Sequence, residues 1–139
     1  MDYKRIKNKV IVRLDPGEEI VESLKQICTK LDINLGIVTG IGATNDARIG
    51  LYDLNSREYH SQDMLGDHEI AQLSGNITTM DDEVYLHLHV NLCNAEHKSF
   101  GGHLNSAVVS ATFEAVIEVI DGKVERKLNK KIGLNLLDI

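Results

Sequence analysis

The sequence predicts an α+β domain with a mainly antiparallel, strongly twisted sheet of about seven to nine strands and one principal helix near the N-terminus. Three observations support this fold class. In most segments apolar residues recur at every second position, which is typical of strands with one buried face. Only one segment has apolar residues at every third or fourth position, as in an amphipathic helix. Most connections between these segments are short, which favours antiparallel neighbours.

The helix is expected to follow the first clear strand. Asp15, Pro16 and Glu18 have the chemistry of a helix start, with Asp15 as the N-cap and Pro16 in the first helical position. Apolar residues then recur at helical spacing from Ile20 to Leu31, so one face of the helix should pack inward. We expect Cys28, beside that face, to be a small buried hydrophobe rather than a reactive thiol.

Turns are expected to divide the rest of the chain into strands. Gly40 and Gly42 are interpreted as a tight turn, because a G-x-G without a third glycine is a weak anion-binding signal. Gly75 is expected to close a strand. The expected strands are residues 10–14, 35–39, 47–52, 69–74, 84–92, 107–119 and 123–128, with a further strand beginning at residue 58.

The C-terminal residues are expected to form a hairpin strand and a tail. Asp121-Gly122 is a strong hairpin signal, so residues 123–128 should pair back on the preceding strand. The tail, residues 132–139, is rich in apolar side chains and should lie against the body or a partner subunit.

Three of the six histidines lie in two short segments. From Val84 to Leu92 every even position is apolar, so His87 and His89 should project from the opposite face, about 6.5–7 Å apart. This spacing lets two imidazoles converge on one ion. The double glycine before His103 should let the backbone approach closely enough for that histidine to supply a third. Zn²⁺ is the natural ion for three imidazoles, although nickel, copper and iron also accept them. Solvated or hydrogen-bonded histidines are the alternative.

Other residues are less suited to this site. A cupin would place a glutamate three or four residues after the second histidine, and Glu96 comes too late for that pattern. Cys93 shares the parity of His87 and His89 but lies at the end of the strand. The remaining histidines and one glutamate are expected in loops or on the surface: His60, His68, His97 and Glu69.

Glu114 is the one candidate for a catalytic role. An open three-histidine zinc can generate hydroxide for hydrolysis, and a carboxylate nearby would then act as a base or orient the water. Glu114 lies on the polar face of the strand at 107–119. Its alternative role is an ion pair with a residue such as Arg13. No pattern for covalent catalysis stands out, and the sequence favours a non-enzymatic protein.

Composition bounds the function further. The 139 residues predict one domain, 1–139, without low-complexity segments. No apolar run approaches the roughly 20 residues that span a bilayer, and the N-terminus does not resemble a signal peptide. With two isolated cysteines, a cytoplasmic location is expected. The net charge of −6 opposes phosphate binding, so DNA is a disfavoured partner.

The order of several short motifs resembles the plants-and-prokaryotes-conserved (PPC) domain over about residues 5–124, leaving 125–139 as the hairpin strand and tail. The family pattern usually has a glycine where this chain has Ala107. The motifs are Arg13-Leu14-Asp15-Pro16-Gly17-Glu18, Gly40-Ile41-Gly42-Ala43, Leu73-Ser74-Gly75-Asn76, Leu86-His87-Leu88-His89, Gly101-Gly102-His103-Leu104 and Glu114 before Val116-Ile117.

The resemblance implies a compact α+β subunit that assembles as a homotrimer. In plants the domain follows AT-hook motifs that contact DNA, whereas prokaryotic members stand alone and are often labelled predicted DNA-binding proteins. Some members carry a metal on the histidines that correspond to His87, His89 and His103. No AT-hook core occurs in this sequence.

Three hypotheses follow. The first is a cytoplasmic, homotrimeric PPC protein that binds a divalent metal, zinc first, through His87, His89 and His103. The second is a DNA-associated regulator, which would need its basic residues to cluster. The third is a metal-dependent hydrolase or lyase assisted by Glu114. The basic residues concerned are Lys4, Arg5, Lys7 and Lys9, or Lys127, Lys130 and Lys131.

Overall fold

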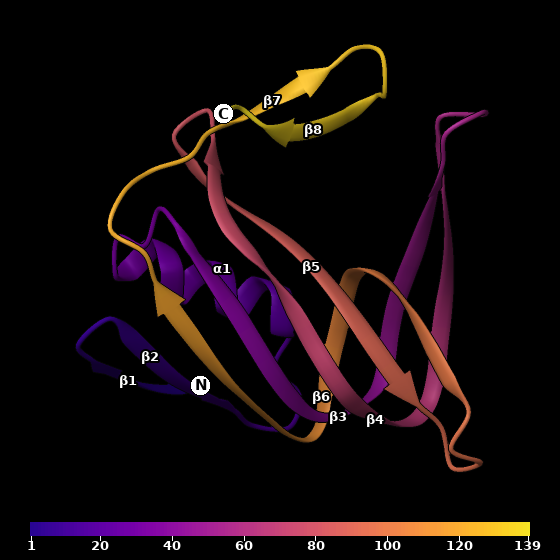
Figure 1. Ribbon diagram of the computed structural model, residues 1–139. Helices are drawn as coiled ribbons and strands as arrows, with labels where there is room; N and C mark the ends of the chain where they lie inside the picture. The colour runs from indigo at the N-terminus through magenta and orange to yellow at the C-terminus, as the bar shows by residue number, and fades with distance from the viewer.

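A long, strongly bent antiparallel sheet dominates the computed structural model, which describes residues 1–139 (Figure 1). Eight strands and one helix form, within the range that the sequence predicts. The helix is not long and apolar enough to span a lipid bilayer. The elements are β1 (Asp2–Ile6), β2 (Lys9–Leu14), α1 (Ile20–Lys30), β3 (Gly36–Asp53), β4 (Glu58–Met80), β5 (Glu83–Cys93), β6 (Ser99–Val119), β7 (Arg126–Asn129) and β8 (Leu134–Leu137).

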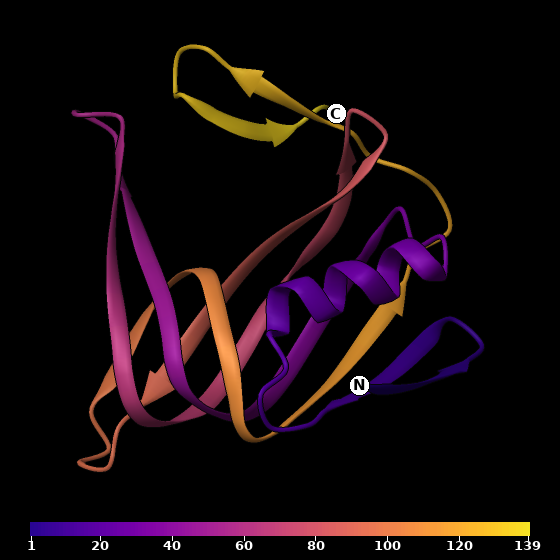
Figure 2. The ribbon, with the colours of Figure 1, turned by 180° about the vertical axis from the view of Figure 1, so that it is seen from behind.

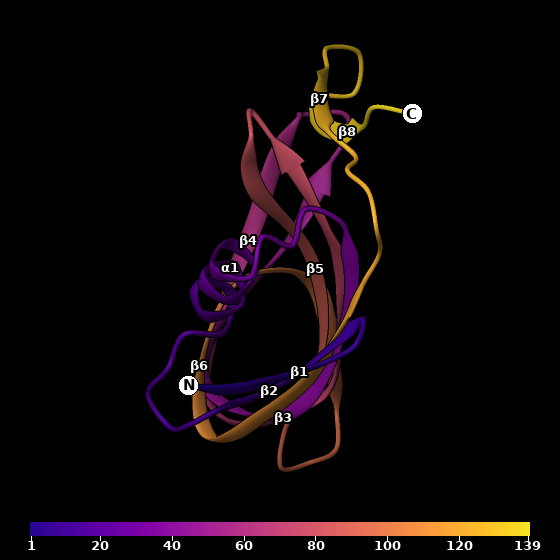
Figure 3. The same cartoon turned by 90° about the vertical axis from the view of Figure 1, so that its left-hand side faces the viewer.

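The main sheet has six strands in the order β1-β2-β6-β3-β4-β5, and every pairing is antiparallel. The first residues of β6 also pair with the end of β5, so β3, β4, β5 and β6 close on themselves. Figure 3 shows this curvature from the side. A separate two-stranded sheet, β7-β8, lies at one end of the molecule.

The core lies between α1 and the curved sheet (Figure 2). Ile20, Leu24 and Ile27 of the helix are fully buried, as their spacing predicts. Phe113 of β6 is the largest of the fully buried side chains. Cys28 is also buried, which raises the pKa of its thiol to about 12 and confirms an inert hydrophobe rather than a nucleophile.

The helix begins later than the sequence predicts. Its N-cap is Glu19, whose carboxylate accepts the backbone N–H of Glu22 at 2.6 Å and that of Ala107 at 2.8 Å. Asp15 and Glu18 instead close a turn before the helix, in which the Glu18 N–H donates to the Asp15 carbonyl at 3.2 Å. A proline followed by a glycine with φ +88° suits that turn. The residues that resemble a helix start therefore form a turn before the helix.

Two predicted breaks in the sheet are absent. Gly40 and Gly42 do not form a turn but lie inside β3, where the pairing with β4 and β6 shifts register. A Cβ on Gly42 would lie 2.3 Å from the Thr112 carbonyl oxygen, so glycine serves close packing there. Likewise Gly75 does not end a strand, because β4 continues to Met80.

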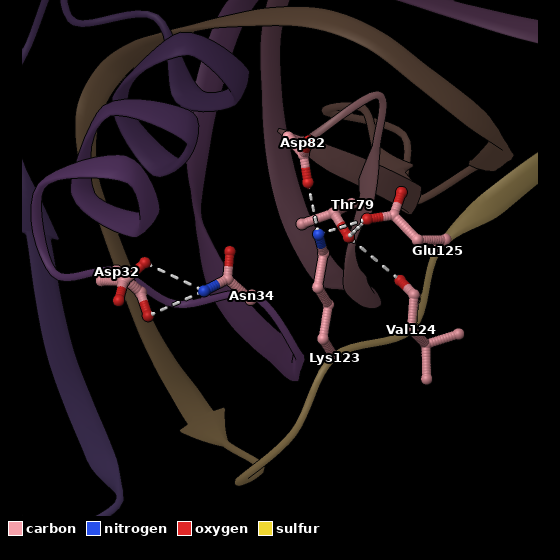
Figure 4. Close-up of polar contacts among 7 residues, drawn as sticks. All are labelled: Asp32, Asn34, Thr79, Asp82, Lys123, Val124 and Glu125. Atoms are coloured by element: carbon pink, nitrogen blue, oxygen red, sulfur yellow. Dashed lines mark hydrogen bonds and ion pairs between the residues drawn. The ribbon is translucent and has the colours of Figure 1, made fainter.

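The C-terminal segment also departs from the prediction. After Asp121-Gly122 the chain does not pair back on β6; it runs to β7, which pairs with β8. Thr79 of β4 holds this connection, because its N–H donates to the Val124 carbonyl at 3.1 Å and its hydroxyl to Glu125 at 2.9 Å (Figure 4). The tail was predicted to lie against the body or a partner subunit, and it contacts the body, where the Tyr52 hydroxyl donates to the Ile132 carbonyl at 2.8 Å.

We expect Glu19→Ala to lower the free energy of unfolding by about 1–3 kcal/mol, because it removes the helix cap and leaves the Ala107 N–H without its acceptor. Asp15→Ala is the control: the Asp15 side chain forms only surface ion pairs, so its loss should cost less than about 1 kcal/mol. Urea unfolding of both variants measures the difference. Equal costs would contradict the assignment of Glu19 as the cap.

Candidate metal site

The three histidines of the two sequence segments meet where β5 pairs with β6. His89 lies directly opposite His103 in the register of these strands, and His87 lies two residues away on the same face. The ring centroids are 5.2 Å apart for His87 and His89, 5.4 Å for His87 and His103, and 5.6 Å for His89 and His103. One nitrogen of each ring lies within 4.8 Å of the others. The imidazoles therefore form a nearly equilateral triangle around one point.

Gly102 lets three strands approach closely beside His103. His103 pairs with His89 on one side and with Gly50 of β3 on the other. A Cβ on Gly102 would lie 2.8 Å from the Gly50 carbonyl oxygen. A side chain at this position would push β3 away, so the double glycine serves to seat His103, as the sequence predicts.

The protonation of the cluster suits metal binding. Burial, followed by the positive charge of Arg126, lowers the pKa of His87 to about 4. Burial also lowers the pKa of His103. Both rings are thus neutral at neutral pH, which is the form that binds a metal. In addition, His103 Nδ1 is buried and has no hydrogen-bond partner in the chain, as expected of a nitrogen that binds a metal ion.

A cavity of about 210 Å³ lies beside the cluster, roofed by the C-terminal hairpin. Neither Arg126 nor this hairpin was identified as part of the site from the sequence. The only signal in the sequence is the apolar tail, which indicates that this segment packs against something but does not identify the contacting residues. The lining residues are Tyr59, Asn76, Tyr85, His87, His103, Arg126, Leu134, Asn135, Leu136 and Leu137.

Glu114 does not join the histidines. It lies eleven residues beyond His103 on β6 and lines a different groove, which includes Ile11 and Ile41. It faces Arg13 in the strand register. However, the ion pairs of Arg13 are with Asp2 and Asp15.

The remaining cysteine and histidine candidates lie outside the cluster. Cys93 Sγ lies 3.9 Å from the Ser99 hydroxyl and belongs to no metal-binding group. His60 and His97 are exposed, as expected. His68 was expected on the surface, but this was wrong: it is 9% exposed, with Nδ1 2.7 Å from the Gly66 carbonyl oxygen. The His68 ring also lies beside the Phe100 ring of β6, with 6.4 Å between the centroids, a contact that no spacing in the sequence indicates.

The family follows from a comparison with known domains. A model of the Plants and Prokaryotes Conserved (PCC) domain matches residues 1–121. The chain belongs to this family. It is the PPC domain that the sequence motifs resemble, and the family match contains all three histidines of the cluster.

Solved structures of the same fold cover nearly the whole chain. A presumptive DNA-binding protein of Bacteroides thetaiotaomicron is 34% identical, with a TM-score of 0.96 over 99% of this chain and 96% of that one. A plant- and prokaryote-conserved protein of Pyrococcus horikoshii is 33% identical (TM-score 0.87; 99% and 94%). A metal-containing protein of Archaeoglobus fulgidus is 30% identical (TM-score 0.87; 99% and 98%). A comparison with curated proteins gave no match.

The lowered pKa of His87 predicts a pH-dependent stability of the metal-free protein. The folded pKa of about 4 is below the ordinary 6.5, so the unfolded chain binds more protons between these values. Stability is therefore lost as the pH falls from about 6.5 to about 4. The glutamine of His87→Gln cannot titrate. We therefore expect the free energy of unfolding of this variant, measured with urea in chelator-treated protein, to depend less on pH than that of the wild type. His97→Gln, in an exposed loop, should retain the wild-type profile; if His87→Gln retains it too, the interpretation is wrong.

Proposed function

We propose that this PPC protein binds a divalent transition-metal ion, Zn²⁺ in the first instance, through His87, His89 and His103. The observation that carries the proposal is the triangle of imidazoles, with a nitrogen of each ring within 4.8 Å of the others. Three imidazoles are a common donor set for zinc with one open position. The partnerless Nδ1 of His103 and the neutral His87 fit the same ion.

A relative supports this reading. The Archaeoglobus fulgidus protein, described as metal-containing, is 30% identical over almost the full length of both chains. If the chain binds zinc, the ion would act as a Lewis acid beside the cavity. The protein itself keeps two imidazoles neutral and encloses one side of the cluster with the β7-β8 hairpin. Catalysis by Glu114 is not included, because that side chain lines another groove.

We also propose that the protein is a cytoplasmic homotrimer. Ile11, Ile37 and Ile41 lie on the sheet face that points away from the core and are 42%, 45% and 60% exposed. A second copy of the chain would remove these side chains from water. The fold has a single helix, which packs on the core face of the sheet. The opposite face is therefore open for such a contact.

DNA binding is the other candidate, favoured by the description of the Bacteroides protein. The net charge of −6 opposes it, and a trimer would multiply that charge. The basic residues are also divided between two places, because Lys4 to Lys9 belong to the β1-β2 hairpin and Lys127 to Lys131 to the β7-β8 hairpin. The charge distribution therefore gives this candidate little support.

Metal analysis tests the main proposal. Protein purified without added metal and then loaded with Zn²⁺ should retain about one ion per chain after desalting, whereas the His87→Ala/His89→Ala double variant should lose at least nine-tenths of it. The matched control is His60→Ala/His97→Ala, which removes two exposed histidines elsewhere. Equal zinc in the wild type and in the His87/His89 variant, by atomic emission, would refute the proposal.

The assembly has its own measurement. Sedimentation equilibrium should give a mass about three times the 15.5 kDa of the chain. Ile41→Glu places a charge on the exposed apolar face, so we expect it to shift the mass towards the monomer. Ile139→Glu is a control at the fully exposed C-terminus and should leave the mass unchanged. A monomeric wild type would exclude the trimer.

A further inference from the structure

A buried arginine faces the cavity beside the histidine cluster. Arg126, the first residue of β7, is only 8% exposed. Its guanidinium donates from Nε to the Thr78 hydroxyl at 2.8 Å, from Nη1 to the Asn135 carbonyl at 2.7 Å and from Nη2 to the Asn76 side-chain oxygen at 2.7 Å. The group also lies 4.8 Å from the centre of the Tyr85 ring. These contacts fix the guanidinium firmly in place.

The charge of Arg126 has no counter-charge. All its acceptors are neutral, and it forms no ion pair. No aspartate or glutamate lines the cavity. The acidic neighbour in sequence, Glu125, points instead to Lys123 at 2.5 Å and to the Thr79 hydroxyl (Figure 4). A buried cation without a carboxylate partner is costly, so this arrangement requires an explanation.

Unused donors remain next to that charge. A guanidinium has five N–H donors, and the three hydrogen bonds of Arg126 leave one on Nη1 and one on Nη2. The side-chain nitrogen of Asn76, which also lines the cavity, donates to no group of the chain. The cavity therefore has a positive charge and free N–H groups, but no carboxylate in its lining.

We propose that this cavity binds a small organic carboxylate, held by Arg126 with the aid of Asn76, next to the histidine cluster. The planar guanidinium fork matches the two oxygens of a carboxylate. The remaining walls are Tyr59, Tyr85 and leucines of β8, which favour a short apolar chain over a fully hydrated inorganic anion. The volume of about 210 Å³ suits a small ligand.

The carboxylate site extends the proposed metal-binding function. It rests on that function in one respect only, the positive charge that a bound metal ion would add to the cavity. A divalent ion on the neutral histidines would add two charges to a cavity that already has one from Arg126. Both forms of the protein should therefore bind the carboxylate, and the metal-loaded form more tightly. Because Arg126 belongs to β7 and also bonds β8, the hairpin that roofs the cavity is itself the anion-binding element.

Titration calorimetry with propionate at pH 7, in a buffer without other carboxylates, tests this on the full chain. We expect saturable binding by chelator-treated and by zinc-loaded protein. Arg126→Gln should weaken it at least tenfold and Arg126→Lys, which keeps the charge but not the fork, by less. The control is Arg57→Gln: Arg57 bonds the hairpin at the Lys131 carbonyl, outside the cavity lining, so affinity should change less than twofold.

A second measurement covers the case in which Arg126→Gln does not fold. In wild-type protein, the NMR signal of the Arg126 Nε–H should shift on addition of propionate, and Arg126→Lys identifies that signal by its loss. The proposal is overturned by an unshifted signal, by no saturable binding, or by equal affinity in Arg126→Gln. Binding of inorganic phosphate without propionate would overturn the assignment to a carboxylate.

The two proposals can fail separately. Propionate binding that depends on Arg126 in protein that takes up no zinc would support the anion site and refute the metal site. Zinc uptake without propionate binding would support the metal site and refute the anion site.

Discussion

The pairing of β5 with the first residues of β6 is the constraint on which the site depends. It closes four strands on themselves and sets His89 opposite His103. A shift of one residue in this register would turn the histidine of one strand to the other face of the sheet. The buried residues Leu88, Val90 and Leu92 prevent this, because they occupy the core face of β5. The same alternation that fills the core thus positions the imidazoles.

Much of this arrangement follows from local sequence patterns. The period-two alternation in β5 predicts which face the two histidines share, and the double glycine predicts the close approach that brings in the third. Helical spacing likewise predicts the buried face of α1. These features depend on neighbours a few residues apart, so a single chain is sufficient to reveal them.

The errors lie where distant contacts decide the local conformation. Gly42 resembles a turn residue, yet its role is set by the backbone of Thr112 on another strand. Glu19 becomes the helix cap because it also bonds Ala107, far along the chain. Arg126 resembles a surface residue of a hairpin, and only the fold brings it against Asn76 and Thr78. No spacing within the sequence carries that information.

The cavity is assembled from two parts of the chain with different constraints. The histidines lie within the matched family domain, residues 1–121, and their strands belong to the closed sheet. The arginine and the leucine wall come from β7 and β8, which form a sheet of their own beyond that match. Substitutions in the β7-β8 hairpin are therefore expected to alter the shape and charge of the cavity without disturbing the register of β5 and β6, which arranges the imidazoles.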